Sequence, residues 1–258
     1  MIDLCIALNG PLVDVLLPIM MHTLQRHCDL SDVHVHFIDK DCTPQVLEYI
    51  CGLSLPFAIT VHQMPEPPDH VRMRWHTPDP ENPEPDPAII RDVAWTCQWM
   101  LDNCGHHEWA FIAHFDIEFR ADLLGYFRSM IADGVGQIGS HATGMVGYRR
   151  KAVASSDVGF HVMDDCYAVK EDGRWKLRRA NDSRCTDKSF PIHGWDVGEL
   201  LEIGLCYKNW RIISPPELEL QKWRIHNGSG CGRCEGANQM IRDRAVLKMK
   251  ELGLAQIV

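Results

Sequence analysis

The 258-residue sequence predicts an α/β fold, in which a mainly parallel, twisted sheet carries helices on both faces. About the first sixty residues alternate short apolar runs with helically spaced apolar residues. This β-α-β-α-β order favours a parallel sheet with crossover helices. Hydrophobic content of 45% and charged content of 24% are ordinary for a soluble globular protein with a sizeable core. We find no internal repeat and no clean linker, so we expect one domain over residues 1–258.

The first half of the chain shows clear periodicity. Apolar residues recur at helical spacing over residues 12–28 and 88–103, which predicts two helices. Pro44 suits the start of a further helix over residues 45–51, because proline is favoured in the first turn. Short apolar or alternating runs predict strands over residues 4–8, 33–38, 57–61 and 109–115. Eight prolines between positions 65 and 87 exclude regular structure there. Such a long loop inside a domain suggests a mobile, functional lid.

The second half is less regular. Helices are expected over residues 121–130, 197–205 and 242–252, and strands over residues 134–139, 143–148 and 210–213. Residues 164–188 are polar, and no regular element is predicted within them.

Charge and cysteine usage limit the class of protein. The net charge of −9 argues against a nucleic-acid-binding protein, which needs a basic surface. No apolar run approaches the ~20 residues of a transmembrane segment, and the N-terminus has no basic start typical of a signal peptide. The eleven cysteines are scattered and odd in number, unlike those of a secreted disulfide scaffold. We therefore expect reduced thiols and a cytoplasmic location.

Two acidic residues directly follow the most strand-like segment of the chain. Period-2 alternation would place the carboxylates of Asp116 and Glu118 on one side, with Ile117 facing away. Paired carboxylates form a site for Mg²⁺ or Mn²⁺, and ligands of α/β sheets bind beyond the carboxyl ends of strands. The alternative is a pair of surface acids that cap the following helix, as Asp122 could also do.

An acidic triplet that closes a strand after a β-α-β-α-β start resembles the family 2 glycosyltransferases, which have a GT-A fold. Two other segments carry this resemblance, namely residues 37–42 (FIDKDC) and residues 193–199 (HGWDVGE). Arg91-Asp92 falls near a further family motif, an Arg-Asn pair. The sequence departs from the family in having Asp116-x-Glu118 in place of Asp-x-Asp, and in lacking the serine expected near Cys42.

The resemblance implies a nucleotide-binding half over residues 1–115 and an acceptor and catalytic half over residues 116–258. It implies that Asp39 contacts the nucleotide base, and that Asp92 and Gly10, in the turn after the first strand, contribute to donor binding. The donor would be a UDP- or GDP-sugar, and the acceptor a hydroxyl of a glycan, a lipid-linked sugar or a protein. Neither the sugar nor the acceptor follows from the sequence.

The resemblance assigns the general base to residues 193–199. An inverting transferase needs a carboxylate that accepts the proton of the incoming hydroxyl, and Asp196 is the first candidate, with Glu199 second. The alternative is structural, because Asp196 followed by Glu199 three residues later also forms a capping box.

A late histidine provides a third expected metal ligand. His226 precedes a glycine-rich stretch, as in many GT-A enzymes that this chain resembles, and an imidazole ligand favours Mn²⁺ over Mg²⁺. A surface loop with an isolated histidine is the alternative. The pair Cys231 and Cys234 forms a CxxC that needs two further ligands to bind zinc, and its role stays open.

Two other functions remain as alternatives. A nucleotidyltransferase on a related sheet would use a similar acidic metal site, but its first loop is normally basic, whereas residues 9–12 (NGPL) carry no Lys or Arg. A catalytically inactive nucleotide-sugar binding module is the alternative outside enzymes.

Overall fold

A computed structural model describes most of the chain, and every structural statement below concerns the described residues. These are residues 1–10, 12–40, 42–53, 55, 57–66, 87–156, 160, 166–171, 174–179, 199–227 and 235–257. Only the backbone is described for residues 87–92, 142, 166–171, 174–179, 199–200, 203, 207 and 235–237.

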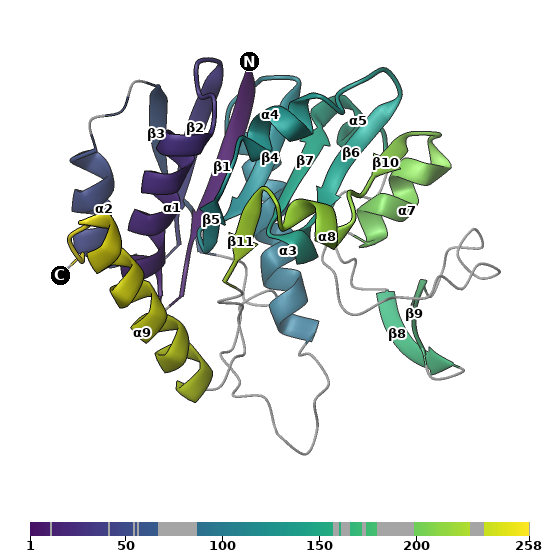
Figure 1. Ribbon diagram of the computed structural model, residues 1–258. Helices are drawn as coiled ribbons and strands as arrows, with labels where there is room; N and C mark the ends of the chain where they lie inside the picture. The colour runs from purple at the N-terminus through teal and green to yellow at the C-terminus, as the bar shows by residue number, and fades with distance from the viewer. Residues whose placement is uncertain are drawn as a thin grey trace.

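A seven-stranded sheet forms the centre of the molecule, in the order β10-β6-β7-β4-β1-β2-β3 (Figure 1). Its strands are β1 (Ile2–Leu8), β2 (Val33–Asp39), β3 (Ala58–Gln63), β4 (Trp109–His114), β6 (Val135–Ser140), β7 (Met145–Arg149) and β10 (Arg211–Ile213). β7 runs antiparallel to both of its neighbours, β4 and β6, whereas the other adjacent pairs are parallel. The mainly parallel α/β sheet expected from the sequence is therefore present.

Helices cover both faces of this sheet, with α1 and α9 in front of it and α3 behind it in Figure 1. The helices are α1 (Val13–His27), α2 (Pro44–Cys51), α3 (Pro87–Asn103), α4 (Leu123–Arg128), α5 (Arg150–Ser155), α7 (Glu199–Tyr207), α8 (Glu217–Leu220) and α9 (Glu235–Leu252). The C-terminal helix α9 is tied to α1 by Arg242, whose Nη1 lies 2.6 Å from Oδ2 of Asp14. Pro44 opens α2 and the Asp122 side chain caps α4, as the sequence suggests.

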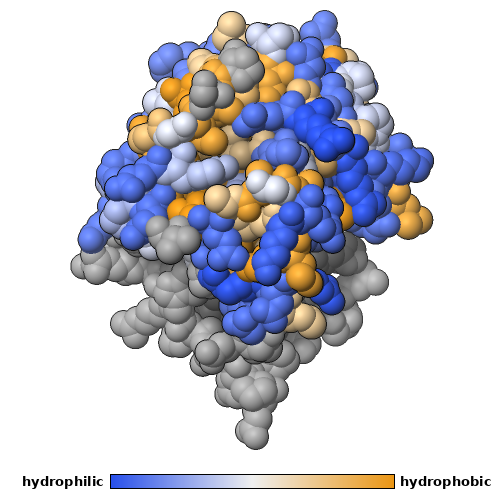
Figure 2. All heavy atoms as spheres, turned by 60° about the vertical axis from the view of Figure 1, so that its left-hand side comes forward, coloured by the Kyte–Doolittle hydropathy of each residue, from blue (hydrophilic) through white to orange (hydrophobic). Residues whose placement is uncertain are grey.

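Two separate apolar clusters lie on the two faces of the sheet. Alternation along each buried strand explains this division, because Val33, Val35 and Phe37 of β2 belong to the cluster beneath α1. The second cluster lies beneath α3 and includes Cys5 and Ile38. The surface on the left-hand side of Figure 1 mixes hydrophilic and hydrophobic residues, as Figure 2 shows.

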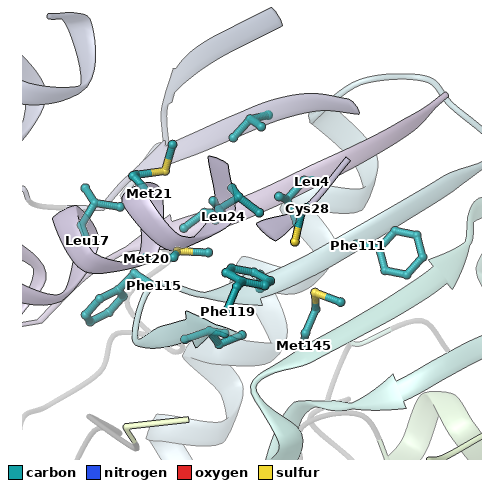
Figure 3. Packing of buried hydrophobic residues seen from close by; sticks show 14 of the residues in the cluster. Leu4, Leu17, Met20, Met21, Leu24, Cys28, Phe111, Phe115, Phe119 and Met145 are labelled. Carbon is teal, nitrogen blue, oxygen red and sulfur yellow. The ribbon is translucent and has the colours of Figure 1, made fainter. Parts of the chain in front are cut away.

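A small two-stranded sheet, β5 (Ile117–Phe119) with β11 (Arg224–His226), lies beside the main sheet. Phe115 lies just before β5 and Phe119 is its last residue, and their rings lie among Met20 and Leu24 of α1 (Figure 3). Both phenylalanines are nearly inaccessible to solvent. The buried rings therefore fix the short segment that carries Asp116.

The structure adds elements that the sequence did not predict. β5 and β11 are absent from the expected elements, and so is the antiparallel pair β8 (Cys166–Glu171) with β9 (Arg174–Arg179) within the polar segment. The last helix begins at Glu235, seven residues earlier than expected.

Candidate metal and donor site

The last residue of β4 and the turn after it provide the first two side chains of the site. β4 pairs with β1 and β7 and is buried until His114, its last residue. Phe115 and Asp116 form the turn between β4 and β5. His114 pairs in register with Ala7, next to the end of β1. Both side chains therefore lie at the carboxyl edge of the parallel strands, where α/β sheets bind ligands.

The third side chain, His226, is brought to this turn by β11. β11 pairs antiparallel with β5, and His226 lies opposite Ile117. The backbone N–H and the side-chain amide of Asn227 both donate hydrogen bonds to the backbone oxygen of Asp116, at 3.1 and 3.0 Å. Strand pairing and the asparagine thus hold two segments together that are more than a hundred residues apart in sequence.

A glycine makes room for the His226 ring. Gly144 has φ of +82°, and a Cβ atom at this position would lie 3.0 Å from Cδ2 of His226. The backbone oxygen of Gly144 also accepts a hydrogen bond of 2.8 Å from the N–H of His114. A larger residue would strain the backbone and displace the imidazole.

His114, Asp116 and His226 form one compact group, in which one ligand atom from each lies within 4.8 Å of the other two. Oδ1 of Asp116 lies 3.3 Å from Nε2 of His226 and 4.0 Å from Nδ1 of His114. Asp116 is buried (3% exposed), whereas His226 and His114 are 20% and 39% exposed. The carboxylate is therefore at the base of the group, and the imidazoles separate it from solvent.

The surroundings favour the uncharged form of His114, which is the form that binds metals. Desolvation lowers the pKa of His114, the Asp116 carboxylate opposes this effect, and His226 and Arg224 lower the pKa further. His141 is the next imidazole along, and burial together with the nearby His114 lowers its pKa to about 3. Two imidazoles and one carboxylate suit borderline divalent cations such as Mn²⁺, Fe²⁺ or Zn²⁺ better than Mg²⁺.

The structure does not place Glu118 in this group. The strand predicted to run into the acidic triplet ends at His114, so the alternation does not continue through the turn to Glu118. The Glu118 carboxylate instead lies 3.1 Å from Nζ of Lys248 on α9. A role for Glu118 as a metal ligand stays a prediction.

Asp39 lies two strands away from His114, at the same edge of the sheet. It ends β2, pairs with Leu8, and is 5% exposed. One oxygen of its carboxylate, Oδ1, accepts a hydrogen bond of 2.9 Å from the backbone N–H of Cys42. Two strand spacings correspond to about 10 Å, so a nucleotide can extend from Asp39 to the His114 group.

Gly10 follows the end of β1, between these two positions in the sheet. It is exposed and has φ of +94°, a conformation that glycine adopts at little cost. Gly10 therefore lies at the carboxyl edge of the sheet, where we expect the donor to bind, and its contact with a donor stays a prediction.

Several other predicted residues lie outside the described part of the chain. Asp196 is outside it, as are Cys231, Cys234 and residues 67–86 of the proline-rich loop. Asp92 lies within α3 and Glu199 is the first residue of α7, but their side chains are not described.

His114 was missed in the sequence, although a signal for it was present. It stands two residues before Asp116, so the same period-2 argument that selected Glu118 applies on the other side of the aspartate. The group that the structure brings together is therefore His114, Asp116 and His226, and a metal-binding role for Glu118 stays a prediction.

Comparison with known proteins agrees with this architecture. No family model matches the sequence, and no curated protein matches it. Among solved structures, the chain is similar to the mannosyltransferase PcManGT from Pyrobaculum calidifontis in complex with GDP-Man and Mn²⁺. That similarity has a TM-score of 0.50 at 11% identity and covers 99% of this chain and 65% of that chain.

Weaker similarities include the bifunctional glycosyltransferase WbbM (TM-score 0.45, 9% identity, 96% of this chain and 44% of that chain). The galactosyltransferase LgtC, in complex with donor and acceptor sugar analogs, follows (TM-score 0.40, 10% identity, 58% of each chain). The similarity to the mannosyltransferase structure concerns the fold, and it confirms the predicted GT-A-like α/β class. Among the helices that the structure describes, none has the length and apolar character needed to span a membrane.

Proposed function

We propose that this protein is a glycosyltransferase that moves a sugar from a nucleoside-diphosphate sugar to an acceptor hydroxyl. The observation that supports this most is the group of His114, Asp116 and His226 at the carboxyl edge of the sheet. The fold around it is shared with a mannosyltransferase that was solved with GDP-Man and Mn²⁺. The assignment to family 2 is a narrower proposal and rests on the sequence motifs.

The three side chains would hold a divalent cation, with Mn²⁺ the expected ion. Asp116 supplies one buried carboxylate and the histidines supply two imidazoles, a donor set that Mg²⁺ rarely accepts. When bound, the cation offsets the negative charge on the diphosphate as the sugar bond breaks. The partial exposure of both imidazoles leaves the solvent side of the group accessible to phosphate oxygens.

The donor would lie along the carboxyl edge, from Asp39 at β2 to Asp116 after β4. In this arrangement Asp39 holds the base through the carboxylate oxygen that does not accept the Cys42 N–H. Gly10 allows the turn after β1 to approach the nucleotide closely. GDP- and UDP-sugars are the donors to examine first, beginning with GDP-mannose because the mannosyltransferase structure contains it.

The acceptor base is proposed to be Asp196, with Glu199 as the second candidate. A single carboxylate that deprotonates the acceptor hydroxyl predicts inversion at the anomeric carbon. The anomeric configuration of the product, measured by NMR, would decide this. A product that retains the donor configuration would exclude Asp196 as the base of a single displacement.

Two alternatives use the same edge of the sheet. A nucleotidyltransferase would release pyrophosphate from a nucleoside triphosphate, and an inactive binding module would bind the nucleotide-sugar without breaking it. Neither alternative releases a nucleoside diphosphate from a nucleotide-sugar, whereas the proposed glycosyltransferase does. Hydrolysis of the donor is therefore the most useful assay.

We expect slow, Mn²⁺-dependent release of nucleoside diphosphate from at least one nucleotide-sugar when no acceptor is present. Asp116→Asn should reduce this rate by about 10³-fold, because loss of the metal removes several kcal/mol of transition-state stabilisation. Asp102→Asn, which changes an exposed aspartate on α3, is the control and should retain the wild-type rate. If a folded Asp116→Asn protein hydrolyses the donor at the wild-type rate with saturating Mn²⁺, the assignment of the site is wrong.

A further inference from the structure

A second group of side chains of the kinds that bind metals lies on the face of the sheet that α3 covers, and it shares no residue with the His114 group. We call it the α3-face group, and it consists of Asp3, His36, His62 and Cys104. His36 is on β2, His62 is on the neighbouring edge strand β3, and Cys104 directly follows α3. One nitrogen of each imidazole and the Cys104 thiol lie within 4.8 Å of one another.

Strand alternation makes this group unusual. Val33, Val35 and Phe37 of β2 belong to the apolar cluster beneath α1, whereas the opposite face of the same strand carries His34 and His36. His36 is buried, and so is Cys104. A buried imidazole on a core face needs polar partners, and His36 has them in Asp3 of β1 and His62 of β3.

The Asp3 carboxylate fixes the orientation of His36. Oδ1 of Asp3 lies 3.2 Å from Nε2 of His36, and Nη2 of Arg150 lies 2.9 Å from Oδ2. A carboxylate oxygen can only accept in this contact, so Nε2 is the nitrogen of His36 that donates to Asp3. The lone pair of the other nitrogen, Nδ1, then points at His62, whose Nε2 is 2.9 Å away. A carboxylate that orients a histidine in this way is a common feature of zinc sites.

We propose that the α3-face group is a zinc site, in which Nδ1 of His36, Nε2 of His62 and the Cys104 thiolate bind Zn²⁺. Two imidazoles and a thiolate are ligands that zinc prefers, and they exclude Mg²⁺ and Ca²⁺. In a tetrahedral zinc site the ligand atoms are about 3.3–3.6 Å apart, so the two imidazoles need to separate by only a few tenths of an ångström. Water would take the fourth position.

The protons balance in this binding step. His62 donates through Nε2 in the metal-free state, so on binding it moves that proton to Nδ1 and uses Nε2 as the ligand. Cys104 loses its thiol proton to solvent, and one proton is released for each zinc ion bound. His62 is partly exposed on the edge strand, which gives the ion a short route from solvent.

Cobalt titration distinguishes this site from the one at the carboxyl edge. Co²⁺ in a tetrahedral site with a thiolate ligand gives a sulfur-to-metal charge-transfer band, whereas His114, Asp116 and His226 contain no sulfur. We expect this band to saturate at one Co²⁺ per chain and to disappear when Zn²⁺ is added. Cys104→Ser should abolish the band and His62→Gln should weaken Co²⁺ binding at least about tenfold.

Two controls keep the test specific. Cys28→Ser changes a buried cysteine in the other core cluster and should leave the band unchanged. A double variant, Cys231→Ser with Cys234→Ser, removes the only CxxC in the sequence and should also leave it unchanged. The proposal is overturned if the folded wild-type protein gives no thiolate band, if Cys104→Ser retains it, or if the double variant loses it. Should Cys104→Ser fail to fold, an unchanged Co²⁺ affinity in His62→Gln would overturn it equally.

Discussion

The two histidine-carboxylate groups of this protein differ in how their buried aspartate is neutralised. Asp3, in the α3-face group, lies in a regular strand and is contacted by the Arg150 guanidinium, by His36 and by both the ring and the backbone N–H of His107. Asp116 lies in a turn, and the imidazoles of His226 and His114 are its neighbours at 3.3 and 4.0 Å. Asp3 has the permanent positive charge of Arg150 beside it, and Asp116 has two imidazoles beside it.

This difference indicates different roles. Desolvation raises the pKa of Asp3, but hydrogen bonds from His36, His107 and Arg150 outweigh it and hold the pKa well below its usual range. A carboxylate that is already compensated contributes to stability and orients His36. The carboxylate of Asp116 is next to two partly exposed imidazoles at the carboxyl edge of the sheet, where the proposed divalent cation would bind.

The largest expected effect on stability is at Asp3. Asp3→Asn keeps the shape of the side chain but leaves the Arg150 charge without its partner, so the free energy of unfolding should fall by about 3 kcal/mol. Urea denaturation measures this change. The exposed Asp102→Asn control should stay within about 0.5 kcal/mol of wild type. A loss below about 1 kcal/mol at Asp3 would contradict the structural role.

The pH dependence of unfolding gives a second measure of how much Asp3 contributes to stability. Because the pKa of Asp3 is depressed in the folded protein, its stabilisation is present above the ordinary carboxyl pKa and is lost as the pH falls below about 4. The stability of Asp3→Asn should therefore depend less on pH in this range than that of the wild type. Equal slopes for both proteins would contradict this assignment.

The smallest expected change in stability is at Glu118, and the same variant tests whether Glu118 belongs to the carboxyl-edge site. If Glu118 serves mainly to pair with Lys248, Glu118→Gln should cost about 1 kcal/mol or less, as partly exposed ion pairs do. Donor hydrolysis should then stay within about twofold of wild type. Lys248→Ala is the matched control and should have a similar effect on stability. If Glu118→Gln lowers donor hydrolysis about 10²-fold and Lys248→Ala does not, Glu118 is a metal ligand.

The sequence predicts most of the central sheet, because its strands are buried runs with local signals. β1, β2, β4 and their helices follow from apolar periodicity, and Asp122 and Pro44 mark helix starts. The β8–β9 pair was missed because polar side chains obscure the alternation, although Asp172-Gly173 between the two strands is a known hairpin signal.

The site was predicted less completely, for a physical reason. Asp116 and His226 were selected, but the pairing of β5 with β11 that brings them together joins segments far apart in the chain. No local pattern specifies such a partner. Glu118 was favoured over His114 because the alternation argument assumed a strand that continues past Asp116, whereas the chain turns there.

The central claim is that the carboxyl-edge group binds a divalent cation, and Mn²⁺ binding followed by electron paramagnetic resonance tests it most directly. In the presence of GDP or UDP, the wild-type protein should remove the signal of free aqueous Mn²⁺ with one ion bound per chain. Asp116→Asn should weaken this binding at least about tenfold, since even indirect partners of a metal ligand contribute that much. Cys104→Ser, which changes the α3-face group, should bind Mn²⁺ as the wild type does. If Asp116→Asn binds Mn²⁺ as tightly as the wild type, the cation is held elsewhere and the account of this site is contradicted.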